Sequence, residues 1–365
     1  MFNASFLRST RLYRHSFLAE RRAAGVCRGL ITKPTNDKFK VLFCGSEMPD
    51  SFRYTKEELR NDPNIEVSFC ERAEVAENIR DADCIIPLMA RIDERLLETG
   101  RNLKLIMQYG VGLEGVDSHK ALQMGIRVAN IPGHGTGNAM SCAEHALYLT
   151  LALLRDQNGM RASLENRVLG APTGEMLAGK TVMIIGFGGI AQQLIPILRP
   201  FRVRMICLRR RDWAQGQWTQ HARDVSKMVA VKTRWADFHM HAQKVDIIIL
   251  TCTQNSESYR MVNQNFLDKC RPGIRIVNVA RGGLLDYDAV RSALEDGQIG
   301  GLGLDVQWSE PFDPNDPIAK HPKVVLTPHI AGVTETSYRN MAKVVAEQVR
   351  RVAAGLAPSK SITCR

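Results

Sequence analysis

The sequence of 365 residues lacks any long hydrophobic run. Its longest apolar stretches, such as residues 247–250, have the length of a strand, whereas a helix that spans a bilayer needs about 18 apolar residues or more. With 44% hydrophobic and 24% charged residues, the composition is that of a globular protein, and the length suggests two domains. We therefore expect no membrane partner.

The nine cysteines lack the close spacing of a metal or disulfide framework, because no two stand as C-x-x-C and their number is odd. Several stand in apolar segments, where cysteine behaves as a small buried residue. His239 and His241 are close in sequence, but no acid or histidine at a matching spacing accompanies them. We expect no metal, no disulfides and a reducing compartment.

The first 19 residues lack acidic side chains altogether. They combine arginines with serines and threonine, and Phe2, Phe6, Tyr13 and Phe17 recur at helical spacing. This composition is typical of an organelle transit peptide, and the missing apolar core argues against a secretory signal. We predict a transit peptide over residues 1–39, for a mitochondrion in preference to a plastid; a disordered basic tail on a cytoplasmic protein is the alternative.

This arm also carries most of the positive charge. Residues 1–39 hold eight basic and two acidic side chains, so they supply six of the eleven net positive charges of the chain. The rest of the chain is closer to neutral and shows no base-reading motif, so we expect no nucleic-acid partner.

From residue 40 onward, short apolar runs alternate with helical patterns, which predicts an α/β fold with parallel sheets and helices on both faces. A helical pattern at residues 143–154 separates two such series. The predicted strands are 41–44, 84–86, 103–107 and 127–130, then 181–185, 203–208, 245–251, 274–279, 302–306 and 324–327. Residues 211–243 are irregular and fit neither pattern.

A glycine-rich turn, T-V-M-I-I-G-F-G-G-I-A, begins at Thr181. Gly186, Gly188 and Ala191 fit G-x-G-x-x-G/A between an apolar strand and a helical pattern, which is the context that a dinucleotide-binding turn requires. The following helix would offer free N–H groups to a pyrophosphate. We predict cofactor contacts here, at Gly186, Gly188, Gly189 and Ile190.

Arginines follow the next predicted strand. NAD-binding folds place an acid there to bind the ribose 2′-hydroxyl, but this sequence has Arg209, Arg210 and Arg211, and its first acid is Asp212. A guanidinium suits a 2′-phosphate by charge and by bidentate geometry. We predict that Arg209 and Arg210 favour NADP(H), with NAD(H) still possible; a solvated basic strand end is the alternative.

Three further segments occur in order: N-V-A-R-G-G-L-L-D from Asn278, G-L-G-L-D-V-Q-W-S-E-P from Gly301, and L-T-P-H-I-A-G from Leu326. With the glycine turn, they resemble the D-isomer-specific 2-hydroxyacid dehydrogenase family over residues 40–355. That family includes reductases of glyoxylate, hydroxypyruvate and phenylpyruvate, and phosphoglycerate and D-lactate dehydrogenases.

The resemblance implies that Arg281 binds the substrate, that His329 donates the proton and that Glu310 is its acid partner. The chemistry agrees: one guanidinium can hold the carboxylate and polarise the adjacent carbonyl of a 2-oxo acid. Histidine titrates near working pH and can protonate the carbonyl oxygen, and a neighbouring carboxylate favours its protonated form. The resemblance also implies cofactor contacts at Val279 and Asp305, the latter with the nicotinamide carboxamide.

The segment Q-Y-G-V-G, residues 108–112, resembles the substrate loop of the family. Backbone N–H groups of Val111 and Gly112 can bind the substrate carboxylate, because glycine permits a close approach. A simple glycine turn is the alternative. Trp308 stands within an active-site motif, either lining the substrate pocket or packing in the core.

The resemblance further implies a Rossmann-like cofactor domain inserted into a flavodoxin-like substrate domain. We expect the substrate domain at residues 40–138 and in a return helix within 328–365, and the dinucleotide-binding domain at 139–327. The site is expected outside the carboxyl ends of the strands. Family members are usually homodimers, so a homodimer is expected.

The leading hypothesis is an NADP(H)-preferring oxidoreductase that acts on a small 2-oxo or D-2-hydroxy acid of unspecified side chain. A dinucleotide-sensing, corepressor-like binding protein is an alternative, because such relatives resemble the dehydrogenases and keep the triad. A formate dehydrogenase-like enzyme is another, since the segment G-N-A-M-S-C-A-E-H, residues 137–145, is similar to that group. Formate dehydrogenases carry glutamine where Glu310 stands, so the carboxylate favours 2-hydroxyacid chemistry.

Overall fold

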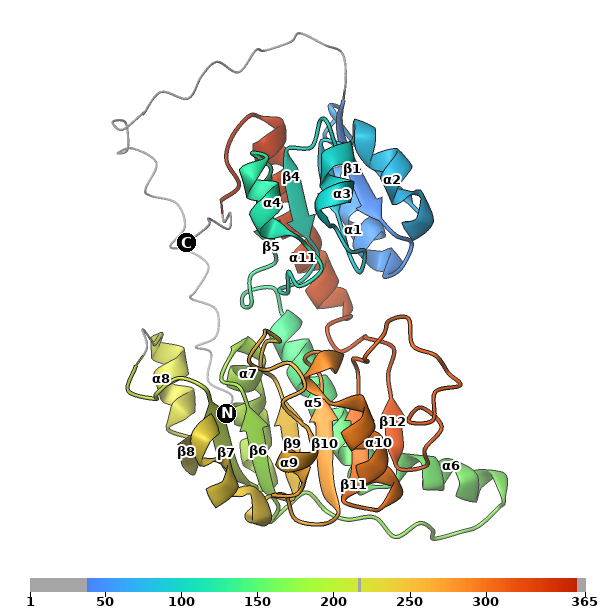
Figure 1. Ribbon diagram of the computed structural model, residues 1–365, viewed down its shortest axis with the longest axis vertical. Helices are drawn as coiled ribbons and strands as arrows, with labels where there is room; N and C mark the ends of the chain where they lie inside the picture. The colour runs from blue at the N-terminus through green and yellow to red at the C-terminus, as the bar shows by residue number, and fades with distance from the viewer. Residues whose placement is uncertain (1–37, 216–217, 360–365) are drawn as a thin grey trace, which may run out of the picture. The chain divides into compact units, whose positions relative to one another are not determined.

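The computed structural model describes residues 38–215 and 218–359, and it consists of parallel sheets covered by helices (Figure 1). The first sheet has five strands in the order β2-β1-β3-β4-β5, and the second has seven in the order β12-β11-β10-β9-β6-β7-β8. These are the strand orders of flavodoxin-like and Rossmann-like folds. The prediction of two parallel α/β sheets is therefore confirmed. The predicted transit peptide lies outside the described residues.

The strands of the first sheet are β1 (Phe39–Cys44), β2 (Ile65–Cys70), β3 (Cys84–Ile86), β4 (Leu105–Gln108) and β5 (Arg127–Asn130). Those of the second are β6 (Thr181–Ile185), β7 (Arg204–Arg209), β8 (Val231–Arg234), β9 (Ile247–Leu250), β10 (Ile274–Asn278), β11 (Ile299–Leu304) and β12 (Val324–Leu326). Central strands such as β9 are buried at every position, as a sheet covered on both faces requires.

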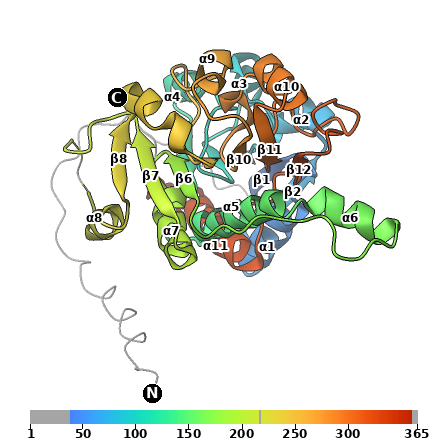
Figure 2. The same ribbon diagram turned by 90° about the horizontal axis from the view of Figure 1, so that it is seen from below.

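The helices are α1 (Pro49–Leu59), α2 (Val75–Asn78), α3 (Glu94–Thr99), α4 (Ser118–Gln123), α5 (Asn138–Leu154), α6 (Gln157–Glu165), α7 (Gly189–Leu198), α8 (Gln220–Ser226), α9 (Gln264–Leu267), α10 (Tyr287–Glu295) and α11 (Glu335–Ala353). On the second sheet, α5 and α7 cover one face, and α9 and α10 cover the other (Figure 2). None of the described helices is long and apolar enough to cross a membrane.

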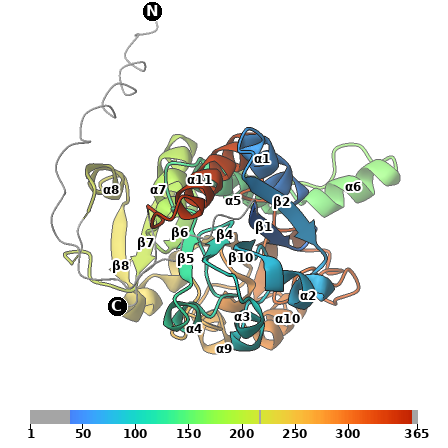
Figure 3. The ribbon, with the colours of Figure 1, turned by 90° about the horizontal axis from the view of Figure 1, so that it is seen from above.

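The return helix α11 packs beside α1 on one face of the first sheet, and α2, α3 and α4 cover the other face (Figure 3). The hydroxyl of Tyr109, just after β4, donates a hydrogen bond to the carbonyl oxygen of Tyr338 in α11 at 2.9 Å. The last strand of the first sheet along the chain ends at Asn130, and the first strand of the second sheet begins at Thr181. The expected domain boundaries at 138/139 and 327/328 stay predictions.

Helix α6 stands apart from the layers. It extends away from the rest of the chain in every view (Figures 1–3), and none of its residues is buried. The side chain of Asn158 ties its start to the second sheet by donating to the carbonyl oxygens of Pro322 and Val324, at 2.9 and 2.8 Å.

Candidate active site

The glycine turn joins β6 to α7 at the carboxyl edge of the second sheet. Gly186 has φ +108°, and a Cβ atom there would lie 2.8 Å from the backbone nitrogen of Cys252. Gly188 faces open space, since nothing lies within 4 Å of the place where its Cβ would be. Helix α7 begins at Gly189, so its free N–H groups point at this opening. The turn therefore has the shape and the donors to hold a pyrophosphate.

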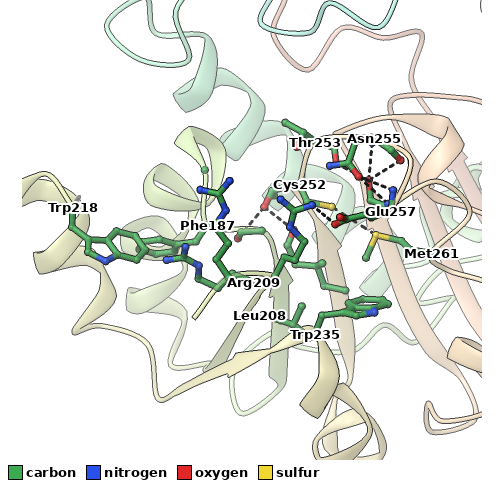
Figure 4. A pocket seen from close by; sticks show the side chains of 17 residues that line it. Phe187, Leu208, Arg209, Trp218, Trp235, Cys252, Thr253, Asn255, Glu257 and Met261 are labelled. Atoms are coloured by element: carbon green, nitrogen blue, oxygen red, sulfur yellow. Dashed lines mark hydrogen bonds and ion pairs between the residues drawn. The ribbon is translucent and has the colours of Figure 1, made fainter. Parts of the chain in front are cut away.

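A cavity of about 640 Å³ lies next to this turn (Figure 4). It is bounded by the ends of β6, β7 and β9, where the order of the strands reverses. Ligands of open α/β sheets bind at such a position. Its lining includes Gly186 and Gly188 from the turn, and Arg209, Arg210 and Arg211 at the end of β7. The predicted glycine and arginine contacts thus surround one cavity.

Aromatic side chains hold Arg209 in this cavity. Its guanidinium carbon lies 4.6 Å from the ring centre of Trp218 and 5.6 Å from that of Trp213, and these two rings stack 5.8 Å apart. Partial burial, together with the charge of Arg211, lowers the pKa of the Arg209 guanidinium. An anion beside Arg209 would offset this unfavourable environment of the cation.

A second cavity, of about 250 Å³, gathers the other predicted site residues. It is lined by residues of the substrate loop, the glycine turn and the three motifs, including Val111, Gly112, Gly188, Gly189, Ile190, Val279, Arg281, Asp305 and His329. Glu310 reaches this site through its contact with His329. The structure therefore brings the predicted catalytic, substrate and nicotinamide-side residues together.

Glu310 and His329 form a close pair. The Nδ1 atom of His329 lies 2.6 Å from Oε2 of Glu310, and Oε1 of Glu310 accepts the backbone N–H of Gln307 at 3.0 Å. Burial raises the pKa of the Glu310 carboxyl, but its bond with His329, the histidine charge, the Gln307 N–H and Arg281 together outweigh burial and lower that pKa. Because Nδ1 faces the carboxylate, Nε2 of His329 is the nitrogen left for a substrate.

Asp305 fixes the backbone around His329. Its carboxylate accepts N–H groups of Ile330 and Ala331, each at 2.8 Å, and the hydroxyl of Thr327 at 2.7 Å, while its carbonyl oxygen accepts the N–H of His329 at 2.9 Å. His329 itself is left-handed, with φ 55°, a conformation that costs a non-glycine residue about 1 kcal/mol. The side chain of Asp305 is only 1% exposed, and its observed contacts are with the backbone around His329 and with Thr327. Its contact with the nicotinamide carboxamide stays a prediction.

Arg281 lies against the substrate loop. Its Nη1 donates to the carbonyl oxygen of Ala280 at 2.7 Å, and its Nε lies 3.6 Å from a carboxylate oxygen of Glu114. A Cβ on Gly112 would meet the guanidinium of Arg281 and the carboxylate of Glu114 unless these two side chains shifted. Arg281 thus faces the loop whose backbone N–H groups were predicted to bind a carboxylate.

The structure decides between two predicted places for Trp308. Its indole N–H donates to the carbonyl oxygen of Leu285 at 2.8 Å, and its ring packs edge-on against Tyr287. It packs beside Tyr287 and lines neither of the two cavities described above, which favours the packing alternative.

Two acids at the site, Glu114 beside Arg281 and Glu257 beside Arg210, were not predicted from the sequence. Neither stands in a recognisable motif, and each meets its arginine through the tertiary structure. Within the described part of the chain, no three His, Cys, Asp or Glu side chains are grouped so that they could hold a metal ion.

Comparisons with known proteins agree with this geometry. The model of the D-isomer specific 2-hydroxyacid dehydrogenase NAD binding domain matches residues 147–331. A glyoxylate reductase of Thermofilum pendens is 31% identical over 79% of this chain and 83% of its own length. A D-3-phosphoglycerate dehydrogenase of Archaeoglobus fulgidus is 29% identical over 74% of this chain, which spans 49% of that relative.

A solved structure of a Thermus thermophilus protein is similar throughout. It has a TM-score of 0.76 and 26% identity, and the match covers 89% of this chain and 100% of that one. The resemblance predicted from the motifs is therefore confirmed at the level of family and fold.

Proposed function

This chain belongs to the D-isomer-specific 2-hydroxyacid dehydrogenase family of oxidoreductases, and from that premise we propose that it is an NADP(H)-preferring reductase of a small 2-oxo acid. The observation that carries the proposal is the pairing of His329 with Glu310 at 2.6 Å, in a site whose cavity is also lined by Arg281 and the glycine turn. A corepressor-like relative that keeps the triad would share this pair, so turnover of a substrate is what distinguishes an enzyme from a binding protein.

In the proposed mechanism, Arg281 and the N–H groups of Val111 and Gly112 bind the substrate carboxylate. Arg281 also polarises the carbonyl. When bound, a nicotinamide dinucleotide would supply the hydride that the carbonyl carbon accepts. His329 gives the proton on Nε2 to the carbonyl oxygen, and Glu310 stabilises the imidazolium before that step. In the reverse direction, neutral His329 accepts the hydroxyl proton.

The residues of the first cavity fit a nicotinamide dinucleotide, the cofactor class of the family. The opening at Gly188 and the start of α7 would hold the pyrophosphate. Arg209 and Arg210 would bind a 2′-phosphate, which supports the preference for NADP(H) over NAD(H).

The test is a matrix of steady-state rates. Glyoxylate, hydroxypyruvate, pyruvate and phenylpyruvate are each reduced with NADPH and with NADH, and we expect turnover of at least one with a lower KM for NADPH. Tight dinucleotide binding without turnover of any of the four would contradict the proposal and favour the corepressor-like alternative.

We also propose that the protein is a homodimer formed around α6. Large apolar side chains are exposed on and after this helix, including Leu164 at 80% and Leu169 at 100% exposure. Several exposed apolar side chains on one segment are typical of an interaction surface. We propose a second copy of this chain as the partner, because most soluble oligomers are homo-oligomers and two-fold dimers are the commonest among them.

A further inference from the structure

An acidic side chain enters the arginine-lined cavity from the loop after β9 (Figure 4). Glu257 forms an ion pair with Arg210. Asn255 fixes the position of this acid, because its side-chain oxygen accepts the backbone N–H groups of Glu257 and Ser258 at 2.9 and 3.1 Å. The acid that the end of β7 lacks is thus supplied to the same cavity by another loop.

The two arginines at the cavity are therefore in different states. Arg209 stacks on Trp218, and among residues 38–215 and 218–359 no carboxylate lies within ion-pair distance of it. Arg210 has its charge neutralised by Glu257. Among the described residues, Arg209 has no carboxylate to be displaced by an anionic ligand, but the ligand must share Arg210 with Glu257 or displace it.

We propose that Glu257 is a specificity-determining residue that competes with the cofactor 2′-phosphate for Arg210. This inference rests on the proposed use of NADP(H). A 2′-phosphate that approaches Arg210 must open the ion pair and meets the negative charge of Glu257. A 2′-hydroxyl needs neither, so NAD(H) can bind with the pair closed. Glu257 thereby makes the preference for NADP(H) over NAD(H) smaller than the arginines alone would make it.

The size of the effect follows from the exposure of the pair. The side chains of Arg210 and Glu257 are 54% and 64% exposed, so opening the pair costs little in itself. Repulsion between Glu257 and a phosphate about 4–6 Å away adds a comparable amount at the dielectric constant of water. Removal of the charge should tighten binding of a 2′-phosphate by about 3- to 10-fold.

The experiment measures binding without turnover, by calorimetry on the full chain. The probes are adenosine 2′,5′-bisphosphate and adenosine 5′-monophosphate, which differ only in the 2′-phosphate, followed by NADPH and NADH. For Glu257→Gln we expect the Kd of the bisphosphate and of NADPH to fall by about 3- to 10-fold, with less than about a 2-fold change for the other two. The gain should shrink as salt is raised, because both charges are exposed.

Two controls isolate the pair. Glu295→Gln removes the same charge from an exposed i,i+4 pair with Arg291, outside the lining of the cavity, and should change no Kd. In the Arg210→Met background, Glu257→Gln should lose the part of its effect that depends on Arg210, as a double-mutant cycle detects. Glu257→Ser serves as a second variant, and thermal unfolding verifies that each protein is folded.

The inference is wrong if Glu257→Gln leaves the affinity for the bisphosphate unchanged or lowers it. It is also wrong if the substitution lowers the affinity for NADH instead. The proposed cofactor preference is tested separately by the parent protein. Equal affinity of the parent for NADPH and NADH contradicts that preference, whereas the ratio of bisphosphate affinities between Glu257→Gln and the parent decides the role of Glu257 in either case.

Discussion

At the scale of single residues, the proton donor is held from two sides. Its Nδ1 faces Glu310, and its backbone is bonded to Asp305 in a left-handed conformation that few non-glycine residues adopt. Strained residues of this kind persist where surrounding contacts over-determine them. Asp305 accepts three consecutive N–H groups, from His329 to Ala331, and these bonds hold His329 in its left-handed conformation.

The pH dependence of reduction tests the His329–Glu310 pair. Reduction needs the imidazolium, so its rate should fall as rising pH removes that proton, while oxidation of the hydroxy acid should rise. Glu310→Gln removes the carboxylate that faces Nδ1 of His329, and we expect the pH profile of reduction to change together with a lower kcat. Superimposable profiles of kcat/KM for the parent and the variant would show that Glu310 does not stabilise the protonated form.

The pKa of Glu310 determines how the rate of reduction behaves at acidic pH. Because the bond with His329 and the nearby charges lower the pKa of Glu310, the carboxylate stays ionised below the usual range of glutamate. Its pairing with His329 is present above that lowered pKa and is lost as pH falls through it. Reduction should therefore persist to mildly acidic pH. A rate that, on acidification, already begins to fall above pH of about 5 would contradict this order of protonation.

Arg209 offers a test of cofactor choice that is independent of Glu257. A charge-assisted contact with a phosphate contributes about 1.5–3 kcal/mol, or roughly 10- to 150-fold in affinity. Arg209→Asp should remove this contact and offer an acceptor to a ribose hydroxyl, so the ratio of NADPH to NADH kcat/KM should fall by at least about 10-fold. An unchanged ratio would assign the preference to Arg210 and Arg211 instead.

These residues also show what a sequence can reveal about a site. Arg281, Glu310 and His329 stand in motifs with fixed neighbours, so their grouping was predictable, although their roles await the tests above. Glu257 and Glu114 were missed because an ion pair across a cavity depends on where two loops meet, and neither loop has a signature. Trp308 was ambiguous because an indole in a motif can pack in a core as readily as it can line a pocket.

At the scale of elements, the buried strands were predictable, and of the four edge strands β5 and β12 were predicted whereas β2 and β8 were not. Strands β3 and β9 are buried at every position and form continuous apolar runs. Strands β2 and β8 lie at sheet edges and alternate or mix exposed with buried positions, so they have no such run. The unassigned stretch around residues 211–243 contains β8, and its Trp213 donates to the carbonyl oxygen of Thr233 in that strand at 2.9 Å.

Helix α6 allows a direct test of the proposed dimer. Replacing Leu164 and Leu169 together by glutamate places charges in the surface that a second copy would cover, and we expect the mass in solution to fall from dimer to monomer. Leu356→Glu is the matched control, because Leu356 is also exposed but lies after α11. Light scattering after size exclusion gives the mass, and an unchanged dimer in the double variant would place the interface elsewhere.

At the scale of the whole molecule, the described fold begins where the basic arm ends. The first strand starts at Phe39, whose N–H donates to the carbonyl oxygen of Asn64 at 2.7 Å, and Lys40 donates to Asp83 at 2.9 Å. Among the described residues, the hydrophobic cores are built from residue 39 onward, and both cavities are lined by residues after it. We therefore expect the sheets, their covering helices and the candidate site to form without the arm.

A chain that starts at Lys38 should accordingly keep its stability and its turnover. Since a loss of 1 kcal/mol lowers the Tm of a domain of 150–250 residues by about 2–4 °C, we expect the Tm to stay within about 2 °C of the full chain, with kcat and KM unchanged. Fusion of residues 1–39 to a fluorescent protein then asks whether the arm alone directs import into mitochondria. Insoluble protein or a clearly lower Tm on truncation would give the arm a structural role, whereas a stable truncated enzyme and a fusion that stays in the cytosol would leave a basic tail without a targeting function.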